Sequence, residues 1–226
     1  MDVQQNIKSK HSTVIPLLKY SLYVATKRSM DISISLLLLV VLAPVILFVL
    51  YKVNKKEGKP LFFKQVYVGK HNQEFMMWTF RTMTNTSRVI RALPPHPFPK
   101  SWSNGVPSKF TFTRDPHKTY TSTGLWLEKY RLDVLPQLFN VLKGEMSLVG
   151  PEPEIPDIAD YYNSYQRRRL DVKPGITGLT QLKGFTSKRY DQKIRHDIHY
   201  IETRSCKLDL KILYRSTSRL FKTIVH

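Results

Sequence analysis

The sequence predicts an α+β protein that is mainly helical: a small membrane-associated domain with a proline-broken re-entrant membrane helix, a short β-hairpin and interfacial amphipathic helices. Three observations predict this class. Residues 32–51 form a charge-free apolar stretch, residues 55–83 alternate apolar and polar side chains, and apolar residues recur with helical spacing in 124–143 and 207–222. A chain of 226 residues suits one domain with a small appendage.

The charge balance predicts an anionic partner. The chain has 36 Lys and Arg against 17 Asp and Glu, a net charge of +19. A nucleic-acid-binding protein that is soluble has no use for the apolar stretch, so no nucleic acid is expected. We assign the charge to anionic membrane lipids and phosphorylated ligands. The single cysteine, Cys206, excludes an intrachain disulfide and a cysteine-built zinc site.

Residues 1–26 are interpreted as a basic N-terminal extension, and residues 27–52 as the membrane helix. About 20 uncharged residues are what a helix needs to cross a bilayer. However, Pro44 removes a backbone donor, and the positive-inside rule gives no orientation because both flanks are basic. We therefore expect a re-entrant helix broken at Ala43–Pro44, with both ends on the cytosolic face. A kinked helix that crosses the bilayer remains the alternative.

Residues 53–226 are expected to form a cytosolic domain. Turn signals at Gly58 and at 69–72 divide 55–83 into two strands of a hairpin. Residues 84–118 are rich in Pro, Ser and Gly and are typical of an irregular loop. The pattern then predicts a helix over 124–143 that ends at Gly144, and another over 157–171. The amphipathic segment 207–222 is a helix that either lies in a membrane interface or packs on the core.

The stretch "RLDVLPQLFNVLKGEMSLVG" carries the candidate catalytic residue, Asp133. Aspartate just ahead of a helical pattern is typical of a helix cap. A carboxylate at a helix N-terminus could equally attack a phosphoryl group, with Mg²⁺ neutralising the charge between carboxylate and phosphate. Both interpretations stay open. The groups predicted to bind a diphosphate are three cations and a glycine-containing loop: Arg81, Arg169, Lys173 and the backbone at Gly175.

Long motifs add a resemblance. "FFKQVYVGK", "FRTM", "LDVLPQLFNVLKGEMSLVGPEPE" and "VKPGITGLTQLKG" follow "KRSMD" and a proline-containing apolar segment. From about Lys27 to Phe221 the chain resembles the bacterial sugar transferase family, the monotopic polyprenyl-phosphate phosphoglycosyl transferases. The resemblance implies a re-entrant membrane helix, an amphipathic helical collar and an active site on the cytosolic face of the bacterial inner membrane. Residues 53–226 would then be the sugar-transferase domain.

The activity implied is transfer of a sugar-1-phosphate from a UDP-sugar to undecaprenyl phosphate. It passes through a covalent aspartyl-phosphosugar, needs Mg²⁺ and initiates exopolysaccharide or another cell-surface glycan. The family's nucleophile maps onto Asp133, which would also contact the metal.

The chain departs from the family at catalytic positions. The glutamate of the Asp-Glu pair is Val134, and the arginine five residues before the nucleophile is Glu128. Four further family cations are replaced, by Tyr67, Thr79, Glu152 and Phe185. The carboxylates that are candidates to replace the missing glutamate are Glu128, Glu145 and Glu152. Two hypotheses follow: an active phosphoglycosyl transferase, or a catalytically weak or inactive membrane-bound paralogue that acts as partner or scaffold among glycan-assembly proteins.

Overall fold

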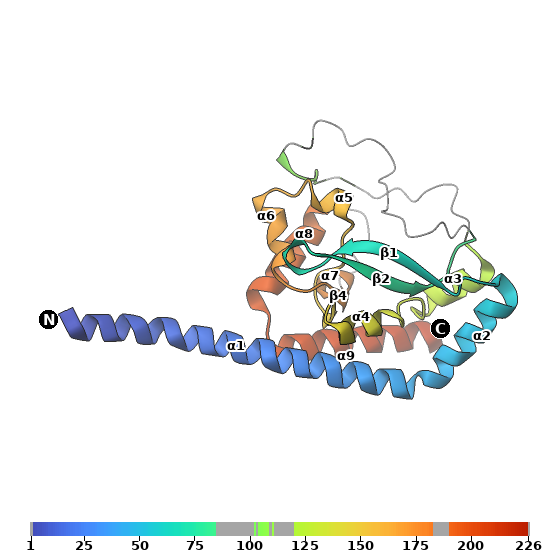
Figure 1. Ribbon diagram of the computed structural model, residues 1–226, viewed down its shortest axis with the longest axis horizontal. Helices are drawn as coiled ribbons and strands as arrows, with labels where there is room; N and C mark the ends of the chain where they lie inside the picture. The colour runs from blue at the N-terminus through green and yellow to red at the C-terminus, as the bar shows by residue number, and fades with distance from the viewer. Residues whose placement is uncertain are drawn as a thin grey trace.

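The computed structural model describes residues 2–84, 102, 104–108, 110, 120–182 and 190–225, with side chains from residue 20 to residue 220. Helices predominate, and two two-stranded sheets accompany them (Figure 1). This confirms the α+β class expected from the sequence. Most of the loop predicted over 84–118 lies outside the described residues, as does Phe185.

Two helices form the base of the molecule. α1 (Asp2–Val41) runs beneath the domain, its N-terminal part projecting beyond it, and α2 (Ala43–Glu57) rises at the other end (Figure 1). α1 continues without interruption across the boundary expected after residue 26. In the described part of the chain no single helix is long and apolar enough to span a membrane, but Tyr20–Val41 and Ala43–Glu57 pass that test together, with a bend of 62°.

The bend has a local cause in the sequence. Leu42 separates the two helices, and Pro44 lies in the first turn of α2. A proline is well tolerated there, because the first amides of a helix have no intrahelical acceptor. The interruption expected at Ala43–Pro44 is therefore present, beginning one residue earlier.

The predicted hairpin is confirmed. β1 (Phe62–Val68) pairs antiparallel with β2 (Glu74–Phe80), with Phe62 opposite Phe80. The connection contains the short 3₁₀ turn η1 (Lys70–Asn72), where the sequence carries its turn signal. The rings of Phe62 and Phe80 stack with their centroids 5.4 Å apart.

The single helix predicted over 124–143 is wrong. The chain forms α3 (Ser122–Lys129) and α4 (Gln137–Lys143), separated by seven residues of turns. Arg131 adopts a left-handed conformation (φ 55°), which cannot continue an α-helix. Gly144 ends α4 in the left-handed conformation, as expected.

The helix predicted over 157–171 is likewise divided, into α5 (Pro156–Ala159), α6 (Ser164–Arg167) and the 3₁₀ helix η3 (Arg168–Asp171). The start of α6 at Ser164 has a clear cause. Asn163 and Gln166 form a capping box, in which each side chain bonds the other residue's backbone amide.

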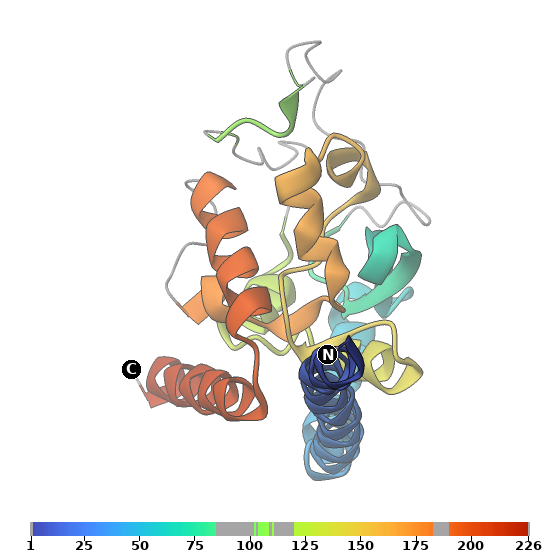
Figure 2. The same ribbon diagram turned by 90° about the vertical axis from the view of Figure 1, so that its left-hand side faces the viewer.

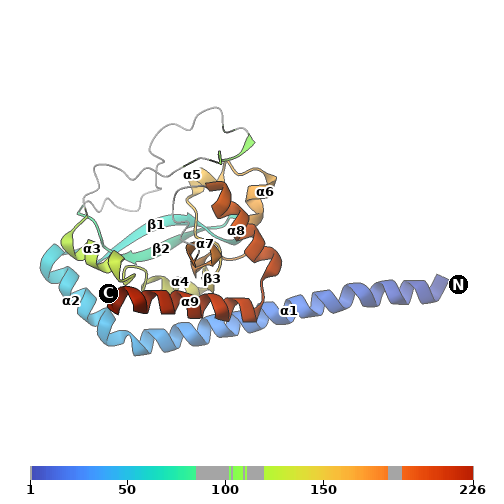
Figure 3. The same ribbon diagram turned by 180° about the vertical axis from the view of Figure 1, so that it is seen from behind.

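The remaining elements close the domain over α1. β3 (Ser147–Val149) pairs in parallel with β4 (Gly175–Thr177), and α7 (Leu179–Leu182), α8 (Tyr190–Thr203) and α9 (Cys206–Val225) follow. α9 confirms the helix predicted over 207–222 and runs beside α1 at the base (Figures 2 and 3). The β3–β4 contact is close, since a Cβ on Gly175 would lie 2.1 Å from the Gly150 nitrogen.

Polar side chains in the "KRSMD" motif attach α1 to the domain. Lys27 donates to a β3 carbonyl (3.0 Å) and to the Asp209 carboxylate of α9 (2.9 Å). Near the C-terminal end of α4, Arg28 donates to the carbonyls of Val141 and Leu142, at 2.6 and 2.8 Å. Asp31 accepts from a β3 amide at 3.1 Å. The apolar helix is therefore an integral part of the domain.

Candidate active site

Asp133 lies in the turn between α3 and α4, held against the end of the hairpin. Its backbone carbonyl accepts a hydrogen bond from the Phe80 amide at 3.0 Å. Phe80 and Leu127 belong to a buried apolar cluster with Val49 and Val53 of α2. Packing between α2, β2 and α3 thus fixes the position of Asp133.

The Asp133 carboxylate is not a helix cap, so that interpretation is wrong. The N-cap of α4 is Pro136, and no side chain caps the helix. The Oδ1 atom of Asp133 is buried and has no hydrogen-bond partner among the described residues. Burial raises the pKa of Asp133 to about 6; the positive charge of Arg131 opposes this shift and the negative charge of Glu128 reinforces it.

One of the three candidate second carboxylates is brought near Asp133. The left-handed turn at Arg131 returns the chain after α3, so the charge of Glu128 acts on Asp133 despite their spacing of five. Glu145 follows the opposite end of α4, and its carboxylate accepts a hydrogen bond from the side-chain amide of Asn140 at 2.6 Å. Glu152 pairs with Lys193 at 3.3 Å.

The described side chains around Asp133 offer few donors for the predicted Mg²⁺. No group of three or more His, Cys, Asp or Glu side chains in the described part of the chain could hold a metal ion. Mg²⁺, however, is commonly bound by one or two carboxylates together with substrate phosphates. The unpartnered oxygen of Asp133, with Glu128 near enough for its charge to act on Asp133, fits that smaller donor set.

Arg81 follows β2 directly but is committed to the backbone. Its buried guanidinium donates to four carbonyls at the end of α2 and just after β2: Met83 (3.0 Å), Thr84 (2.8 Å), Glu57 (3.3 Å) and Lys59 (3.5 Å). These bonds close the segment after α2 onto the hairpin. Phosphate binding by Arg81 stays a prediction.

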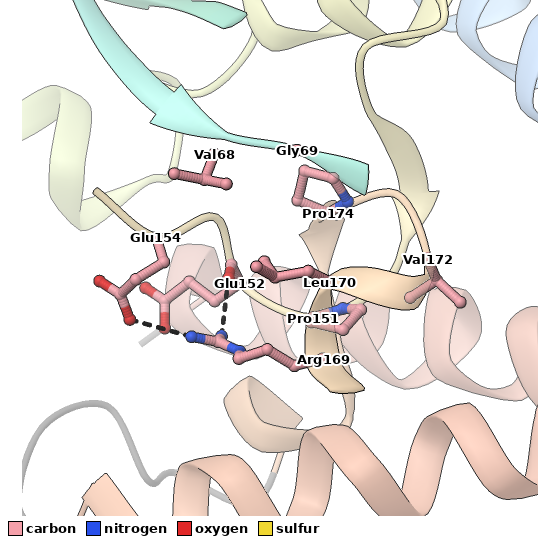
Figure 4. A pocket seen from close by; sticks show the side chains of 9 residues that line it. All are labelled: Val68, Gly69, Pro151, Glu152, Glu154, Arg169, Leu170, Val172 and Pro174. Atoms are coloured by element: carbon pink, nitrogen blue, oxygen red, sulfur yellow. Dashed lines mark hydrogen bonds and ion pairs between the residues drawn. The ribbon is translucent and has the colours of Figure 1, made fainter. Parts of the chain in front are cut away.

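Arg169 lies in a buried charge network (Figure 4). It donates hydrogen bonds to the Glu154 carboxylate at 2.9 Å and to the Glu152 carbonyl at 2.8 Å. It also forms an ion pair with Asp197 at 2.7 Å, but the geometry of this pair is not that of a hydrogen bond. Burial opposes ionisation of Glu154, yet Lys193 and Arg169 hold its pKa down at about 2. Arg169 therefore acts here as the internal counter-charge of two carboxylates, Glu154 and Asp197, and phosphate binding by Arg169 stays a prediction.

The space beside this network is small. A cavity of about 10 Å³, enough for one water molecule, is lined by residues of β1 and η3 and by residues that follow β1, β3 and η3. Figure 4 shows them: Val68, Gly69, Pro151, Glu152, Glu154, Arg169, Leu170, Val172 and Pro174. A nucleotide does not fit into this cavity.

Lys173 and Gly175 complete the set predicted from sequence, and they lie apart from Asp133. The Lys173 ammonium and the Arg28 guanidinium are each 3.4 Å from where a Cβ on Gly144 would stand, at the C-terminal end of α4. The Gly175 amide donates to the Pro151 carbonyl at 2.8 Å. The predicted phosphate-binding residues therefore do not meet in one site in this conformation.

Sequence reasoning missed Arg131 as a site residue. It stands two positions before Asp133, its side chain is exposed, and its charge favours the ionised form of Asp133. The signal in the sequence was its adjacency in "RLDV". The left-handed backbone that places it there has no signature in an arginine.

The fold and the site together define a class: an α+β domain built onto a bent apolar helix pair, with an aspartate, Asp133, next to the helix that carries "LPQLFNVLKG". The buried oxygen of this aspartate has no hydrogen-bond partner among the described residues. The chain belongs to the bacterial sugar transferase family, whose model matches residues 22–223.

Curated relatives agree with this assignment. The chain is 38% identical to the sugar transferase EpsL of Bacillus subtilis, over 83% of each chain. It is 35% identical to the exopolysaccharide production protein ExoY of Sinorhizobium fredii, over 84% of this chain and 83% of that one. It is 34% identical to the UDP-glucose:undecaprenyl-phosphate glucose-1-phosphate transferase of Klebsiella pneumoniae, over 86% of this chain and 40% of that one. Membership and these names support a phosphoglycosyl transferase enzyme.

Proposed function

We propose that this chain transfers a sugar-1-phosphate from a UDP-sugar to undecaprenyl phosphate at the cytosolic face of the bacterial inner membrane, initiating an exopolysaccharide or another cell-surface glycan. The name of the Klebsiella relative supports both substrates, and that of the Sinorhizobium relative supports the product class. The observation that carries the proposal is the Asp133 carboxylate, buried at Oδ1 without a partner among the described residues.

In this proposal Asp133 is the nucleophile. An ionised oxygen of Asp133 attacks the phosphorus that bears the sugar, an O–P bond forms, and the P–O bond to UMP breaks as UMP leaves with the electron pair. An oxygen of undecaprenyl phosphate then attacks the same phosphorus, and the Asp133 carboxylate is released unchanged. With a pKa of about 6, Asp133 is largely ionised at pH 7.5.

Asp133 and Glu128 would hold the Mg²⁺ that the family implies. The ion supplies charge neutralisation between the carboxylates and a diphosphate. Arg131 adds a fixed positive charge next to Asp133 and so favours the ionised, nucleophilic form.

Membrane attachment is proposed through the bent pair α1–α2. From Ile32 to Tyr51 the pair carries no charged side chain, and large apolar side chains near the bend are exposed. Exposed apolar patches of this kind mark interaction surfaces. With basic residues on both flanks, a re-entrant segment with both ends in the cytosol accounts for the pattern better than a crossing.

One observation favours a second candidate, a catalytically weak or inactive partner or scaffold in a glycan-assembly complex. Glu152, where the resemblance to the family implies an arginine, pairs with Lys193, and Arg169 is paired with two carboxylates. Two cations otherwise available to a diphosphate are thereby neutralised within the protein.

A turnover experiment separates the two candidates. The purified full-length protein is given undecaprenyl phosphate, Mg²⁺ and a panel of radiolabelled UDP-sugars, with Asp133→Asn as the matched variant. We expect a lipid-linked product from one sugar of the panel, reduced about 10³-fold or more in the variant. Equal, background-level product from both proteins across the panel would favour the scaffold.

A further inference from the structure

A cluster of positive charges lies at the C-terminal end of α4, where α1 crosses it. Arg28 and Lys173 converge on Gly144, each within 3.4 Å of the position of its absent Cβ. Arg28 is partly compensated, because it donates to two terminal carbonyls of α4, where the helix dipole is negative. Lys70, in the hairpin turn, is close enough for its charge to act on Lys173.

The two lysines of this cluster lack acceptors. Neither the Lys70 nor the Lys173 ammonium makes a hydrogen bond or ion pair with any residue that the structure describes. Burial lowers the pKa of Lys173, and repulsion from Arg28 lowers it further. Attraction to Asp31 opposes these two effects, and Lys70 adds a smaller repulsion. A half-buried ammonium without an acceptor is unfavourable, so the cluster is suited to an anion that the protein itself does not provide.

The position of the cluster points to a lipid. Arg28 precedes the charge-free stretch that begins at Ile32 by one helical turn, so it lies at headgroup level if the bent pair is embedded. On α4, Phe139 is 51% exposed, and Lys143, one turn later, is exposed and lies over the Trp78 ring at 5.4 Å. Aromatic and basic side chains in this arrangement are typical of a membrane–water interface.

We propose that Arg28, Lys70 and Lys173 bind the phosphate of an anionic bilayer lipid. Ammonium and guanidinium groups together suit a phosphodiester oxygen pair. The site is separate from the reaction centre, because Asp133 and Gly144 flank opposite ends of α4, a helix that rises about 10 Å over its seven residues. The inference rests on the membrane attachment in the proposed function and not on its chemistry.

Lysine acylation read by mass spectrometry tests this site residue by residue. The full chain is placed in nanodiscs of phosphatidylcholine, in nanodiscs containing phosphatidylglycerol, and in non-ionic micelles with inorganic phosphate or chloride at equal ionic strength. We expect acylation of Lys173 to slow several-fold in phosphatidylglycerol relative to phosphatidylcholine. Lys211, exposed on α9, reports in the same digest on general coverage by the bilayer.

Two variants sharpen the result. Lys70→Gln should reduce the protection of Lys173, whereas Lys143→Gln removes the same charge outside the cluster and should not. Protection by inorganic phosphate without an effect of phosphatidylglycerol would contradict the lipid source. Equal slowing at Lys173 and Lys211, or none at Lys173 in any condition, would overturn the site. Asp133→Asn protein should give the same protection, so failure here is distinguishable from failure of the transfer reaction.

Discussion

The carboxylate of Asp133 lies in a partly buried environment that disfavours its ionised form. Burial raises its pKa to about 6 from an ordinary value of 3.8, and one oxygen has no partner in the described structure. Groups of this kind cluster at functional sites, because a substrate or ion can supply the missing interaction. The motif in the sequence identified Asp133, but not the approach of Glu128, which depends on the turn at Arg131.

Because burial of the ionised Asp133 carboxylate destabilises the folded state, we expect a pH-dependent gain in stability for Asp133→Asn. The pKa is raised in the folded state, so the protonated form stabilises the fold fully below about pH 4, and this contribution is lost as the pH rises through about 6. At pH 8, with chelator and without substrate, the variant should exceed wild type by on the order of 1–3 kcal/mol in urea unfolding. The difference should vanish near pH 4. Asp171→Asn, at an exposed aspartate, is the control, and equal stabilities at pH 8 would refute the argument.

At the scale of elements, α4 is fixed by a fully buried asparagine. The Asn140 side chain donates to the Met76 carbonyl (2.7 Å) and accepts from the Trp78 amide (3.2 Å), so it satisfies the free edge of β2 as a neighbouring strand would. It also donates to Glu145. This contact sets the distance between the hairpin and the helix that follows Asp133.

Replacing that side chain with one of similar volume should loosen α4. Asn140→Leu leaves a buried strand amide and carbonyl unpaired, and we expect a loss of about 2–4 kcal/mol in the free energy of unfolding. The neighbouring Phe139→Leu, at an exposed position, should change it by less than about 1 kcal/mol. Thermal unfolding in detergent micelles measures both, and equal losses would show that the bonds to β2 do not hold the helix.

Local patterns predicted some elements and not others. The hairpin and α9 follow from alternation and amphipathic spacing, which depend on neighbouring residues alone. Arg167, Arg168 and Arg169 look alike in the sequence, yet only the third is buried, because Glu154 and Asp197 reach it from distant segments. Tertiary pairing of this kind has no local signature, so Arg169 was assigned to phosphate from sequence and found in the core.

At the scale of the whole molecule, the part that the structure describes is strongly apolar around the bend between α1 and α2. The large apolar side chains exposed there are Leu36, Leu37, Val40, Val41, Leu47, Phe48 and Tyr51. At its margin Lys52 lies 3.7 Å from the centre of the Trp126 ring. An apolar surface bordered by aromatic and basic groups is what an embedded segment requires.

Accessibility labelling tests how this end meets the bilayer. In a Cys206→Ser background, Ser21→Cys and Lys56→Cys place one thiol before α1 enters the apolar region and one after α2 leaves it. If the segment is re-entrant, a membrane-impermeant maleimide should label both positions in inverted inner-membrane vesicles and neither in intact spheroplasts. Labelling of the two positions from opposite sides would establish a crossing helix instead.

The central claim, that Asp133 carries the phosphosugar, is tested most directly by the mass of the protein after one half-reaction. Full-length protein is mixed with UDP-sugar and Mg²⁺ without undecaprenyl phosphate, and then digested. We expect the peptide containing Asp133 to gain the mass of one phosphosugar, undecaprenyl phosphate to remove that mass, and Asp133→Asn never to acquire it. Lipid-linked product formed equally by wild type and Asp133→Asn, with no such adduct, would contradict it.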